Sequence, residues 1–382
     1  MHNIDAMLDK MRDESLEAAV VIKEAKDVGQ RVLGTYCVFT PVEIIRATGA
    51  WAVSLCSKKA DPIPAAEEHL PRNLCPLIKA SYGYAYTDTC PYFFLSDAVI
   101  GETTCDGKKK MYEYLNRIKP VHVMQLPQTL DDSAIFQWRE SVLKMSTWLE
   151  EFYGIKITED NLSKAIREGN AERKALNEFF ALSKLDPAPV TGLEIMMVSD
   201  WTRLIYDPNE IVRRLHELTN AIRENYENGE RRTAADRKRI LVTGCPLGKA
   251  VEKTIVAIEE NGGTVVCYDN CGHYKGTLEM VDETQDPLEA IADKYMHTAC
   301  SVISPNDRRM NILSRFADEY QIDGVVDIVL QACHTYAIET MRVRETMNNK
   351  GNIPYISIET DYYQGDTEQL STRMGAFMEM MS

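Results

Sequence analysis

The segment that most constrains the fold of this chain is a β-branched apolar run at 323–330, which leads directly into Gln331-Ala332-Cys333-His334-Thr335-Tyr336. Such a run predicts a strand that is buried on both faces of a parallel sheet. Because the residues from 336 to 347 have helical spacing, Cys333 lies where a strand ends and a helix begins. In an open parallel sheet, ligands bind along that edge.

The alternation of strand and helix recurs in both halves of the chain. Further strands are expected at 31–37, 51–56, 93–100, 121–127, 239–244, 264–269 and 352–361. This alternation is typical of α/β domains with parallel sheets. The stretch from 133 to 228 has helical periodicity instead, at 136–152, 158–183 and 208–228. We therefore expect an α/β protein with an N-terminal lobe at 1–130 that begins with an amphipathic helix, a helical insertion and linker at 131–235, and a C-terminal lobe at 236–382.

Length, charge and hydropathy limit the classes of partner. A chain of 382 residues suggests at least two domains. The net charge of −15 argues against binding to nucleic acid, which needs a basic surface. No apolar run approaches the ~20 residues of a membrane span, and the charged N-terminus lacks the features of a signal peptide. We expect a cytoplasmic protein that binds neither nucleic acid nor membrane.

The chain has 10 cysteines, and in a reducing cytosol these remain thiols. Five directly follow expected strands, namely Cys37, Cys105, Cys245, Cys271 and Cys333. Cys75 precedes Pro76 and is expected at a helix start, where unpaired N–H groups favour a thiolate. Cys267, within a strand, and Cys56 are expected to be small buried hydrophobes instead. If the two lobes face each other, the six thiols at strand ends and the helix start can surround one crevice.

The spacing of the cysteines indicates which inorganic group they hold. No C-x-x-C pair occurs, which argues against a structural zinc ribbon or a ferredoxin-type cluster. Soft thiolates select zinc, copper(I) or iron–sulfur clusters. Six candidate thiols exceed the four of a zinc site, so an iron–sulfur cluster held between the lobes is favoured.

Four further features have both a structural and a functional interpretation. Gly244-Cys245-Pro246-Leu247-Gly248 lacks the G-x-x-x-x-G-K-[ST] pattern of a phosphate loop, so any ATP used is expected to be hydrolysed by another protein. Lys108-Lys109-Lys110 is either a solvated helix start or a contact for an anion or a partner. His334 either donates to a cluster sulfide or a substrate, or is simply hydrogen-bonded. Glu359 and Asp361 lie at a strand end, where they relay protons or only cap the turn.

Five sequence motifs resemble one known family. They are Gly34-Thr35-Tyr36-Cys37-x-x-x-Pro41-x-Glu43, Asn73-Leu74-Cys75-Pro76, Glu102-Thr103-Thr104-Cys105-Asp106-Gly107-Lys108-Lys109, Thr243-Gly244-Cys245-Pro246 and the motif from Gln331 to Tyr336. Together, and over nearly the whole chain, they resemble the 2-hydroxyacyl-CoA dehydratase D-component superfamily, and within it the double-cubane cluster proteins. The resemblance implies two Rossmann-like lobes with a helical region, and an iron–sulfur cluster between the lobes.

The resemblance also implies the ligands. Cys75, Cys105 and Cys333 match the three ligands of one [4Fe-4S] cubane in the dehydratase pattern. A double-cubane protein holds an [8Fe-9S] cluster, in which a sulfide bridges two cubanes, and it needs three more thiolates. Cys37, Cys245 and Cys271 are the first candidates for these. Cys90 and Cys300 remain alternatives because they too lie in expected loops.

The function implied is that of an iron–sulfur reductase that works under anaerobic conditions. A separate homodimeric ATPase with its own [4Fe-4S] cluster would inject low-potential electrons, and a small substrate would be reduced at the double cubane. His334, Glu359 or Asp361 would supply protons. Double-cubane proteins resemble homodimers, whereas the dehydratases are heterodimers. Two alternatives stay open: a 2-hydroxyacyl-CoA dehydratase subunit with one [4Fe-4S] cluster, and a non-catalytic iron–sulfur electron carrier.

Overall fold

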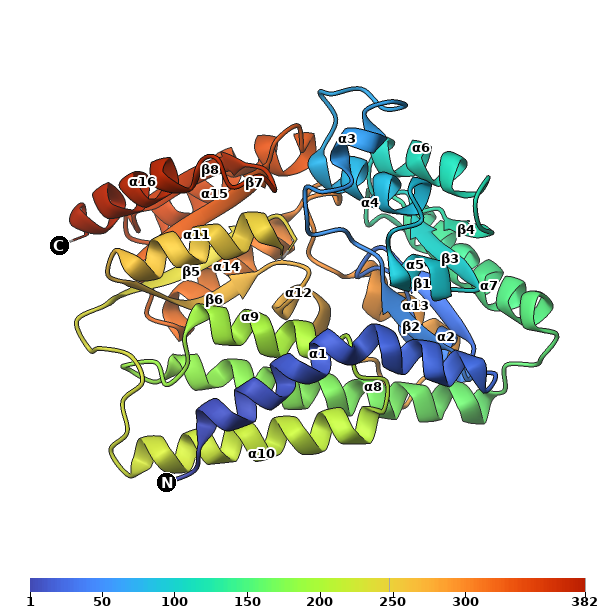
Figure 1. Ribbon diagram of the computed structural model, residues 1–382, viewed down its shortest axis with the longest axis horizontal. Coiled ribbons are helices and arrows are strands. Elements are labelled where there is room, and N and C mark those ends of the chain that lie inside the picture. Colours follow the sequence, from blue (N-terminus) through green and yellow to red (C-terminus); the bar gives the residue numbers. More distant parts are fainter. Residues whose placement is uncertain (247, 382) are drawn as a thin grey trace.

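The computed structural model describes residues 1–246 and 248–381, and it contains two four-stranded parallel sheets (Figure 1). The first sheet consists of β1 (Val32–Thr35), β2 (Trp51–Ser54), β3 (Ala98–Glu102) and β4 (Val121–Met124). The second consists of β5 (Lys238–Gly244), β6 (Gly263–Asp269), β7 (Gly324–Leu330) and β8 (Tyr355–Thr360). The expectation of an α/β protein with two Rossmann-like lobes is therefore confirmed. The expected turn at 244–248 includes Leu247, which lies outside the described residues.

Both sheets have the same strand order. It is β2-β1-β3-β4 in the first lobe and β6-β5-β7-β8 in the second, with every pairing parallel. In each lobe the chain leaves the first strand toward one side of the sheet and later crosses to the other side. That places a topological switch point between β1 and β3, and another between β5 and β7. Loops diverge at the carboxyl ends of these strand pairs and leave room for a ligand.

Helices surround both sheets. Those of the first lobe are α2 (Val42–Ala47), α3 (Ile63–Ala66), α4 (Pro76–Tyr86), α5 (Pro91–Leu95), α6 (Asp106–Leu115) and α7 (Asp132–Tyr153). The second half of the chain adds α11 (Lys249–Glu260), α12 (Tyr274–Thr277), α13 (Pro287–Met296), α14 (Asp307–Glu319), α15 (His334–Asn349) and α16 (Thr367–Glu379). Every residue of β6 and β7 is buried, which explains why their sequences are continuous apolar runs. Among the described residues, no helix is both long and apolar enough to cross a membrane.

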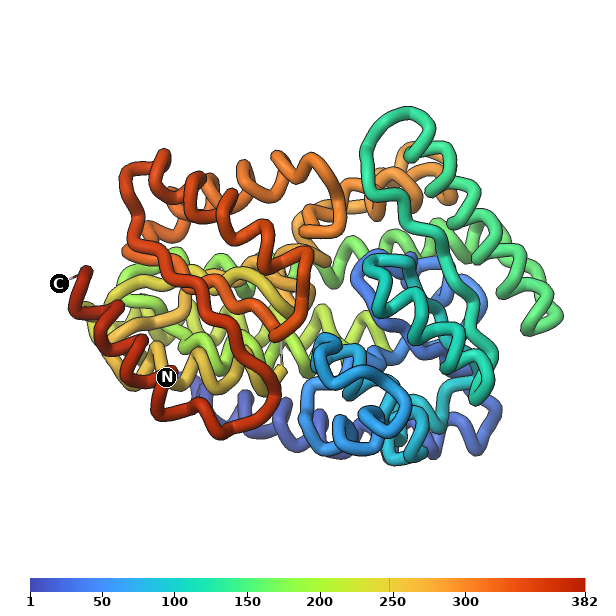
Figure 2. The backbone as a smooth tube through the Cα atoms, turned by 90° about the horizontal axis from the view of Figure 1, so that it is seen from above, coloured from blue at the N-terminus to red at the C-terminus, as the bar shows by residue number. Residues whose placement is uncertain are grey.

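The two lobes lie side by side, and a layer of helices runs along both (Figures 1 and 2). This layer contains α1 (Ile4–Asp27), α8 (Glu159–Phe180) with the 3-10 turn Ala181–Lys184, α9 (Gly192–Trp201) and α10 (Pro208–Glu227). The helix α1 buries Ile4, Leu8 and Met11, whose spacing gives one apolar stripe, and it packs against α9 and α10. The helix α8 contacts α2 in the first lobe, and also α12 and α13. The helical layer therefore connects the lobes.

A buried ion pair fixes α8 to the first lobe. Arg173 in α8 donates to one carboxylate oxygen of Glu43 in α2, and Tyr295 in α13 donates to the other at 2.8 Å. Burial alone would raise the pKa of Glu43, but the charge of Arg173 lowers it to about 2. The three residues tie together three segments that are far apart in the sequence.

The helix α13 belongs to the second half of the sequence but packs on the first lobe. The indole N–H of Trp138 in α7 donates to the carbonyl of Ala292 at 3.0 Å. The apolar core around Trp138 combines Leu33 of the first sheet with Ile291 of α13. The division of the chain at 130 and 236 stays a prediction.

One expected strand, at 93–100, is wrong in its first half. Pro91–Leu95 forms the short helix α5, and β3 begins at Ala98. The Cys90 sulfur accepts a hydrogen bond from the Phe93 N–H at 3.4 Å, and Pro91 occupies the first turn, where its missing N–H costs nothing. These local helix-start signals override the strand propensity of the aromatic residues.

The helix α9 is missing from the sequence-based expectation. It begins with a capping box, in which Thr191 and Glu194 exchange hydrogen bonds. Ile195, Val198 and Trp201 are buried, and the helix packs against α1 on one side and β6 and α11 on the other. A helix covered on several sides has no clear polar face, so amphipathic periodicity does not reveal it.

Candidate metal centre

Cysteines stand at the carboxyl edge of both sheets. Cys37 follows β1 and Cys105 follows β3, the two strands at the first switch point. Cys245 follows β5 and Cys333 follows β7 at the second switch point, and Cys271 follows β6. The two lobes therefore present thiols from equivalent corners of their sheets.

The three cysteines that match the dehydratase ligand pattern share one local position. Cys75, Cys105 and Cys333 are the N-cap residues of α4, α6 and α15. The Cys105 sulfur accepts a hydrogen bond from the Lys108 N–H at 3.4 Å. A sulfur at an N-cap faces unpaired N–H groups and the positive end of the helix dipole, and both favour a thiolate.

The first turns of α4 and α6 touch, so Cys75 and Cys105 lie at neighbouring helix starts. Gly107 makes this approach possible, because a Cβ at this position would lie 2.4 Å from Cδ1 of Ile78. Gly107 and Ile78 each lie in the first turn of their helix. A larger residue at position 107 would push the two helix starts apart.

Cys75 and Cys333 bring the two lobes into contact at the site. A hydrogen bond between their thiols has the largest influence on the pKa of each. This hydrogen bond lowers the pKa of Cys333 to about 6, although burial opposes the charge. The same hydrogen bond, together with burial, raises the pKa of Cys75. One cysteine from each lobe is therefore within reach of a shared group.

The other candidate ligands form a continuous group with this pair. The electrostatic neighbours of Cys245 include Cys333 and Cys271. Those of Cys37 include Cys271 and Cys300, although Cys37 belongs to the first lobe. Burial raises the pKa of Cys37 and of Cys245, and it raises the pKa of Cys271 to about 11. The thiols of the two lobes thus face a common interior rather than separate surfaces.

The backbone before Cys245 is tightly constrained. Gly244 has a φ of +108°, and a Cβ at this position would lie 2.1 Å from the carbonyl oxygen of Ile328. The Cys245 N–H donates to that same carbonyl at 2.8 Å. Only glycine fits this left-handed turn against the neighbouring strand, and the turn sets where the Cys245 sulfur lies.

The two alternative ligands differ in their surroundings. Cys300 is 5% exposed, its sulfur lies 3.8 Å from the Tyr336 hydroxyl oxygen, and it neighbours Cys271. Cys90 caps α5 instead, and burial raises its pKa. Of the two, Cys300 is the one that the fold brings into the thiol group.

Cys56 packs against the apolar core and also neighbours the thiol group, so its expected role as a small buried hydrophobe stays a prediction. Its sulfur donates to the carbonyl of Tyr36 at 2.7 Å, and it neighbours Cys271 and Lys108. Cys56 follows β2 much as Cys37 follows β1. The strand-end pattern that selected the other cysteines would have selected this one as well.

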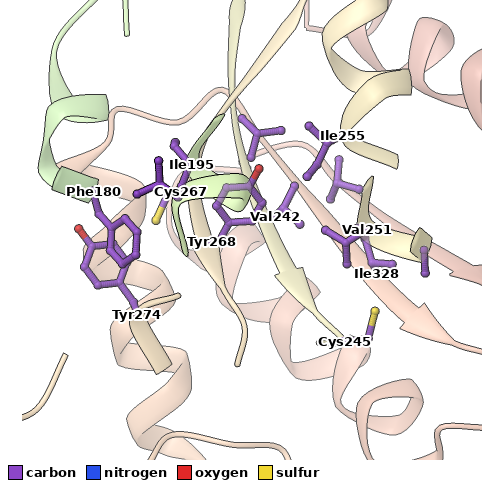
Figure 3. Packing of buried hydrophobic residues seen from close by; sticks show 14 of the residues in the cluster. Phe180, Ile195, Val242, Cys245, Val251, Ile255, Cys267, Tyr268, Tyr274 and Ile328 are labelled. Carbon is purple, nitrogen blue, oxygen red and sulfur yellow. The ribbon is translucent and has the colours of Figure 1, made fainter. Parts of the chain in front are cut away.

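Cys267 lies apart from the thiol group, as expected. It is fully buried within β6. Figure 3 shows it near Ile195 and Tyr268 in the apolar core, whereas Cys245 lies beyond the end of its strand. Cys267 is therefore a small hydrophobic residue of the core.

Three buried polar atoms around the thiol group have no hydrogen-bond partner among the described residues. They are the hydroxyl oxygens of Tyr362 and Tyr112 and the Oε2 atom of Glu102. Tyr362 is 2% exposed and neighbours Cys245 and Cys75, and Tyr112 neighbours Glu102. Leaving a buried polar group unpaired costs about 1–3 kcal/mol. A polar group bound near the thiols would supply these atoms with partners.

Two lysines are buried beside the thiols. Lys108 in α6 donates to the carbonyl of Tyr36 at 2.9 Å. Lys275 in α12 donates to the Tyr336 hydroxyl at 2.6 Å. Neither residue was selected by the cysteine pattern, because burial of a lysine has no signature in the sequence.

The run Lys108-Lys109-Lys110 is expected from the sequence to be either a solvated helix start or a contact for an anion or a partner. Its three lysines differ in this respect. Lys109 and Lys110 form surface ion pairs with Asp106 and Glu113 at 2.8 and 2.7 Å. They are a solvated helix start. Lys108 points inward and is 7% exposed, so the solvated interpretation does not apply to it.

A network of buried charges supports the strand ends of the second lobe. Arg309 is 1% exposed and donates to Asp269 and to Thr243, each at 2.7 Å. Burial would raise the pKa of Asp269, but Lys275 and Arg309 lower it, so its carboxylate is ionised. The network joins the ends of β5 and β6, which precede Cys245 and Cys271.

The three candidate proton donors lie near the carboxyl ends of β7 and β8. His334 is exposed and is the first residue of α15. Glu359 is exposed on the edge strand β8. Asp361 accepts a hydrogen bond from the Tyr363 N–H at 2.8 Å, which is the turn-capping role, and it lies 3.9 Å from Lys253. Their catalytic roles stay predictions.

The donor set, which consists of soft thiols, fits an iron–sulfur cluster. Among the described residues, no three His, Cys, Asp or Glu side chains gather tightly enough to hold one metal ion. A cluster has a different requirement, because each thiolate binds its own iron and the ligands stand farther apart. Soft thiols, unpaired buried polar atoms and buried cations together fit an anionic cluster with sulfur ligands.

The family follows from comparison with known proteins. The model of the 2-hydroxyglutaryl-CoA dehydratase D-component family matches residues 37–381. The chain is 48% identical over 380 residues, with 99% of both chains covered, to the YjiM protein of Escherichia coli (strain K12), provisionally named a dehydratase subunit. It is 25% identical over 369 residues, 94% of each chain, to the beta subunit of (R)-phenyllactyl-CoA dehydratase from Clostridium sporogenes. It is 20% identical over 401 residues, 99% of this chain and 100% of the relative, to the beta subunit of (R)-2-hydroxyglutaryl-CoA dehydratase from Acidaminococcus fermentans. The chain belongs to the 2-hydroxyglutaryl-CoA dehydratase D-component family.

Proposed function

We propose that this protein is an iron–sulfur reductase of the double-cubane type, with an [8Fe-9S] cluster bound between its lobes. The observation that supports this most directly is the thiol group to which both lobes contribute, with Cys75 and Cys333 in contact. When bound, such a cluster would supply a very low reduction potential and iron sites at which a small substrate can be reduced.

Six cysteines hold the cluster in this proposal. Cys75, Cys105 and Cys333 bind one cubane, which is supported by their shared N-cap position and the contact between α4 and α6. Cys37, Cys245 and Cys271 bind the other, which is supported by the position of Cys271 as a neighbour of both Cys37 and Cys245. Cys300 and Cys56 are the nearest replacements.

The electrons come from a separate ATP-hydrolysing protein that carries its own [4Fe-4S] cluster. The absence of a phosphate-loop pattern in this sequence supports hydrolysis by a partner. A difference of 30 mV for a two-electron couple corresponds to about 1.4 kcal/mol. Hydrolysis of one ATP can therefore drive an electron to an acceptor whose reduction potential is lower by hundreds of mV in order of magnitude. A full set of six thiols in one chain supports a homodimer, in which each copy holds a complete cluster.

The protons that accompany these electrons come from acidic groups of this chain. His334 directly follows Cys333, and Asp361 directly precedes Tyr362, whose hydroxyl faces Cys245 and Cys75. Glu359 is exposed on β8 and lies two residues before Asp361, which directly follows the strand. These three residues deliver protons to the reduced substrate.

The names of the relatives favour a second candidate. The Clostridium sporogenes protein is a dehydratase subunit, and its match covers 94% of this chain. As a dehydratase subunit with one [4Fe-4S] cluster, this chain would pass one electron to a CoA thioester, which then loses water. That activity needs an open iron site and room for CoA. A third candidate, a non-catalytic electron carrier, shares the ligands but has no substrate.

Counting iron and acid-labile sulfide after anaerobic purification separates the first two candidates. About eight irons per chain support the double cubane, and about four support the dehydratase. Turnover of small substrates with the ATPase partner and ATP separates both enzymes from the carrier. A preparation that holds zinc, but neither iron nor sulfide, would contradict all three.

A further inference from the structure

Two ammonium groups are buried at the thiol group, and neither lies within ion-pair distance of a carboxylate among the described residues. Lys108 is 7% exposed and Lys275 is 8% exposed. Across the described residues, ion pairs form for Lys109 and Lys110 but for neither of these two lysines. A buried charge without a partner is expensive, so its presence requires a compensating charge nearby.

The surroundings of Lys108 do not neutralise it. Its ammonium donates to the Tyr36 carbonyl at 2.9 Å, and that carbonyl also accepts from Cys56. The nearest carboxyl is that of Glu102, which accepts a hydrogen bond from Thr40 and lies beyond ion-pair distance from the ammonium. The remaining neighbours of Lys108 include thiols, which carry charge only once they ionise or bind metal.

The surroundings of Lys275 are similar. Its ammonium donates to the Tyr336 hydroxyl at 2.6 Å. The nearest carboxylate, that of Asp269, is bound by Arg309 at 2.7 Å and by Thr243 at 2.8 Å. The other neighbours of Lys275 include Cys300 and Cys271.

The two lysines form a matched arrangement across the lobes. Lys108 lies 5.9 Å from the ring centroid of Tyr36, which directly precedes Cys37. Lys275 lies 5.1 Å from the ring centroid of Tyr336, in the helix that begins after Cys333. Each lobe therefore places one ammonium and one tyrosine ring beside its candidate ligands.

We propose that Lys108 and Lys275 are the counter-cations of the bound cluster, one from each lobe, and that they set its reduction potential. This inference rests on the proposed function, because it requires an anionic cluster among the thiols. Thiolate-bound clusters are negatively charged, and reduction adds a further negative charge. A fixed cation nearby stabilises the reduced form, so its removal makes the potential more negative. Both lysines act on the potential of the cluster through their charge and take no part in the chemical step.

The test compares Lys108→Met and Lys275→Met with a control at the opposite edge of the first sheet. Methionine keeps the apolar stem and removes the charge. The control is Lys26→Met, because Lys26 pairs with Asp97, whose other oxygen accepts from the N–H of Val32 at the start of β1. Iron and sulfide are counted in each protein, and the midpoint potential is measured by redox titration with electron paramagnetic resonance detection.

Each inward lysine variant is expected to reduce the ratio of reduced to oxidised cluster at least tenfold at a fixed potential, which corresponds to about 59 mV for a one-electron couple. Lys26→Met is expected to keep the wild-type potential. Loss of iron from the two inward variants, with full iron in Lys26→Met, would also support the proposal. Full iron with unchanged potentials in both inward variants would overturn it and leave the proposed function intact.

A second readout uses the metal-free protein and does not depend on cluster assembly. Without the cluster, Lys108 has no carboxylate at ion-pair distance among the described residues, and Lys275 is balanced only by Asp269, which Arg309 already binds. Lys108→Met and Lys275→Met are therefore expected to raise the thermal unfolding temperature. Lys26→Met removes a paired charge and is expected to lower it. Destabilisation by the inward variants equal to that of the control would show that the protein itself compensates these charges, and it would overturn the inference. A wild-type protein without iron and sulfide would overturn the proposed function as well.

Discussion

The Cys75 thiol of the first lobe lies within hydrogen-bonding reach of the Cys333 sulfur of the second lobe. The segment that carries α3 and α4 lies beside the carboxyl edge of the second sheet, which makes this contact possible (Figure 1). Each residue is also the N-cap of a helix. A group bound by both cysteines would bind the assembled lobes and not the unfolded chain, so cluster binding and folding are coupled.

Replacing either member of this pair tests the first cubane. Cys75→Ala and Cys333→Ala are each expected to lose about half of the bound iron, because one cubane loses a ligand and the other keeps its own set. Iron and acid-labile sulfide per chain are measured after anaerobic purification. Cys267→Ala is the matched control, since Cys267 is a fully buried core residue within β6, apart from the thiol group. Full iron content in Cys333→Ala would exclude Cys333 as a ligand.

The second set of ligands is tested by comparing Cys271 with Cys300. Both neighbour Cys37, so position alone does not separate them. Cys271→Ala is expected to lose about half of the iron, and Cys300→Ala is expected to retain it, if Cys271 is the ligand. The reverse result would assign the second cubane to Cys300 in place of Cys271.

Gly244→Ala is expected to unfold the corner that carries Cys245. The new Cβ would lie 2.1 Å from the Ile328 carbonyl oxygen at a φ of +108°, so the free energy of unfolding should fall by more than about 3 kcal/mol. Gly262→Ala is the control, because Gly262 has a φ of +91° but nothing within 4 Å of the added Cβ. It should cost only about 1–2 kcal/mol. If urea unfolding shows equal losses in the free energy of unfolding for Gly244→Ala and Gly262→Ala, the steric explanation is contradicted.

Arg173→Met is expected to destabilise the protein strongly. It leaves the buried Glu43 carboxylate without its charge partner, and breaking such a pair costs about 3–5 kcal/mol. Arg213→Met is the control, since Arg213 forms exposed pairs with Glu210 and Glu217 that are worth about 0.2–1 kcal/mol each. The free energies of unfolding of both variants are compared with that of the wild type in denaturant titrations. A loss for Arg173→Met no larger than that of the control would show that this ion pair does not fix α8 to the first lobe.

The same carboxylate predicts a pH dependence. The pKa of Glu43 is lowered in the folded protein to about 2, because Arg173 outweighs the opposing effect of burial. The unfolded value is about 4.3, so the stability contributed by ionised Glu43 is complete above about pH 5 and is lost as the pH falls toward 2. The difference in stability between wild type and Glu43→Gln should therefore shrink between about pH 6 and about pH 3. A difference that stays constant over this range would mean that Glu43 does not titrate with folding.

Much of the fold could be predicted from local pattern. The apolar runs that became β5, β6 and β7 are buried on both faces, so their sequences show no alternation and are easily recognised. The cysteines at strand ends then follow from the geometry of parallel sheets. The run at 93–100 misled because Pro91 and Cys90 start a helix, and a cap of this kind overrides propensity.

The features missed are those that depend on contacts between distant segments. Burial of Lys108 depends on where α6 meets β1, and nothing in a lysine run reveals which side chain points inward. The Tyr362 hydroxyl has no hydrogen-bond partner among the described residues, and this becomes meaningful only once Cys245 and Cys75 are seen beside it. Cys56 is different, because it follows β2. The rule that selects cysteines at strand ends would have found it as well.

The most direct test of a cluster shared by both lobes is anomalous diffraction at the iron absorption edge, from crystals grown without oxygen. Iron peaks are expected between the lobes, within bonding distance of the sulfurs of Cys75, Cys105 and Cys333, with further peaks beside Cys37 and Cys245. Iron bound by the cysteines of one lobe alone, or no iron peak between Cys75 and Cys333, would contradict the account.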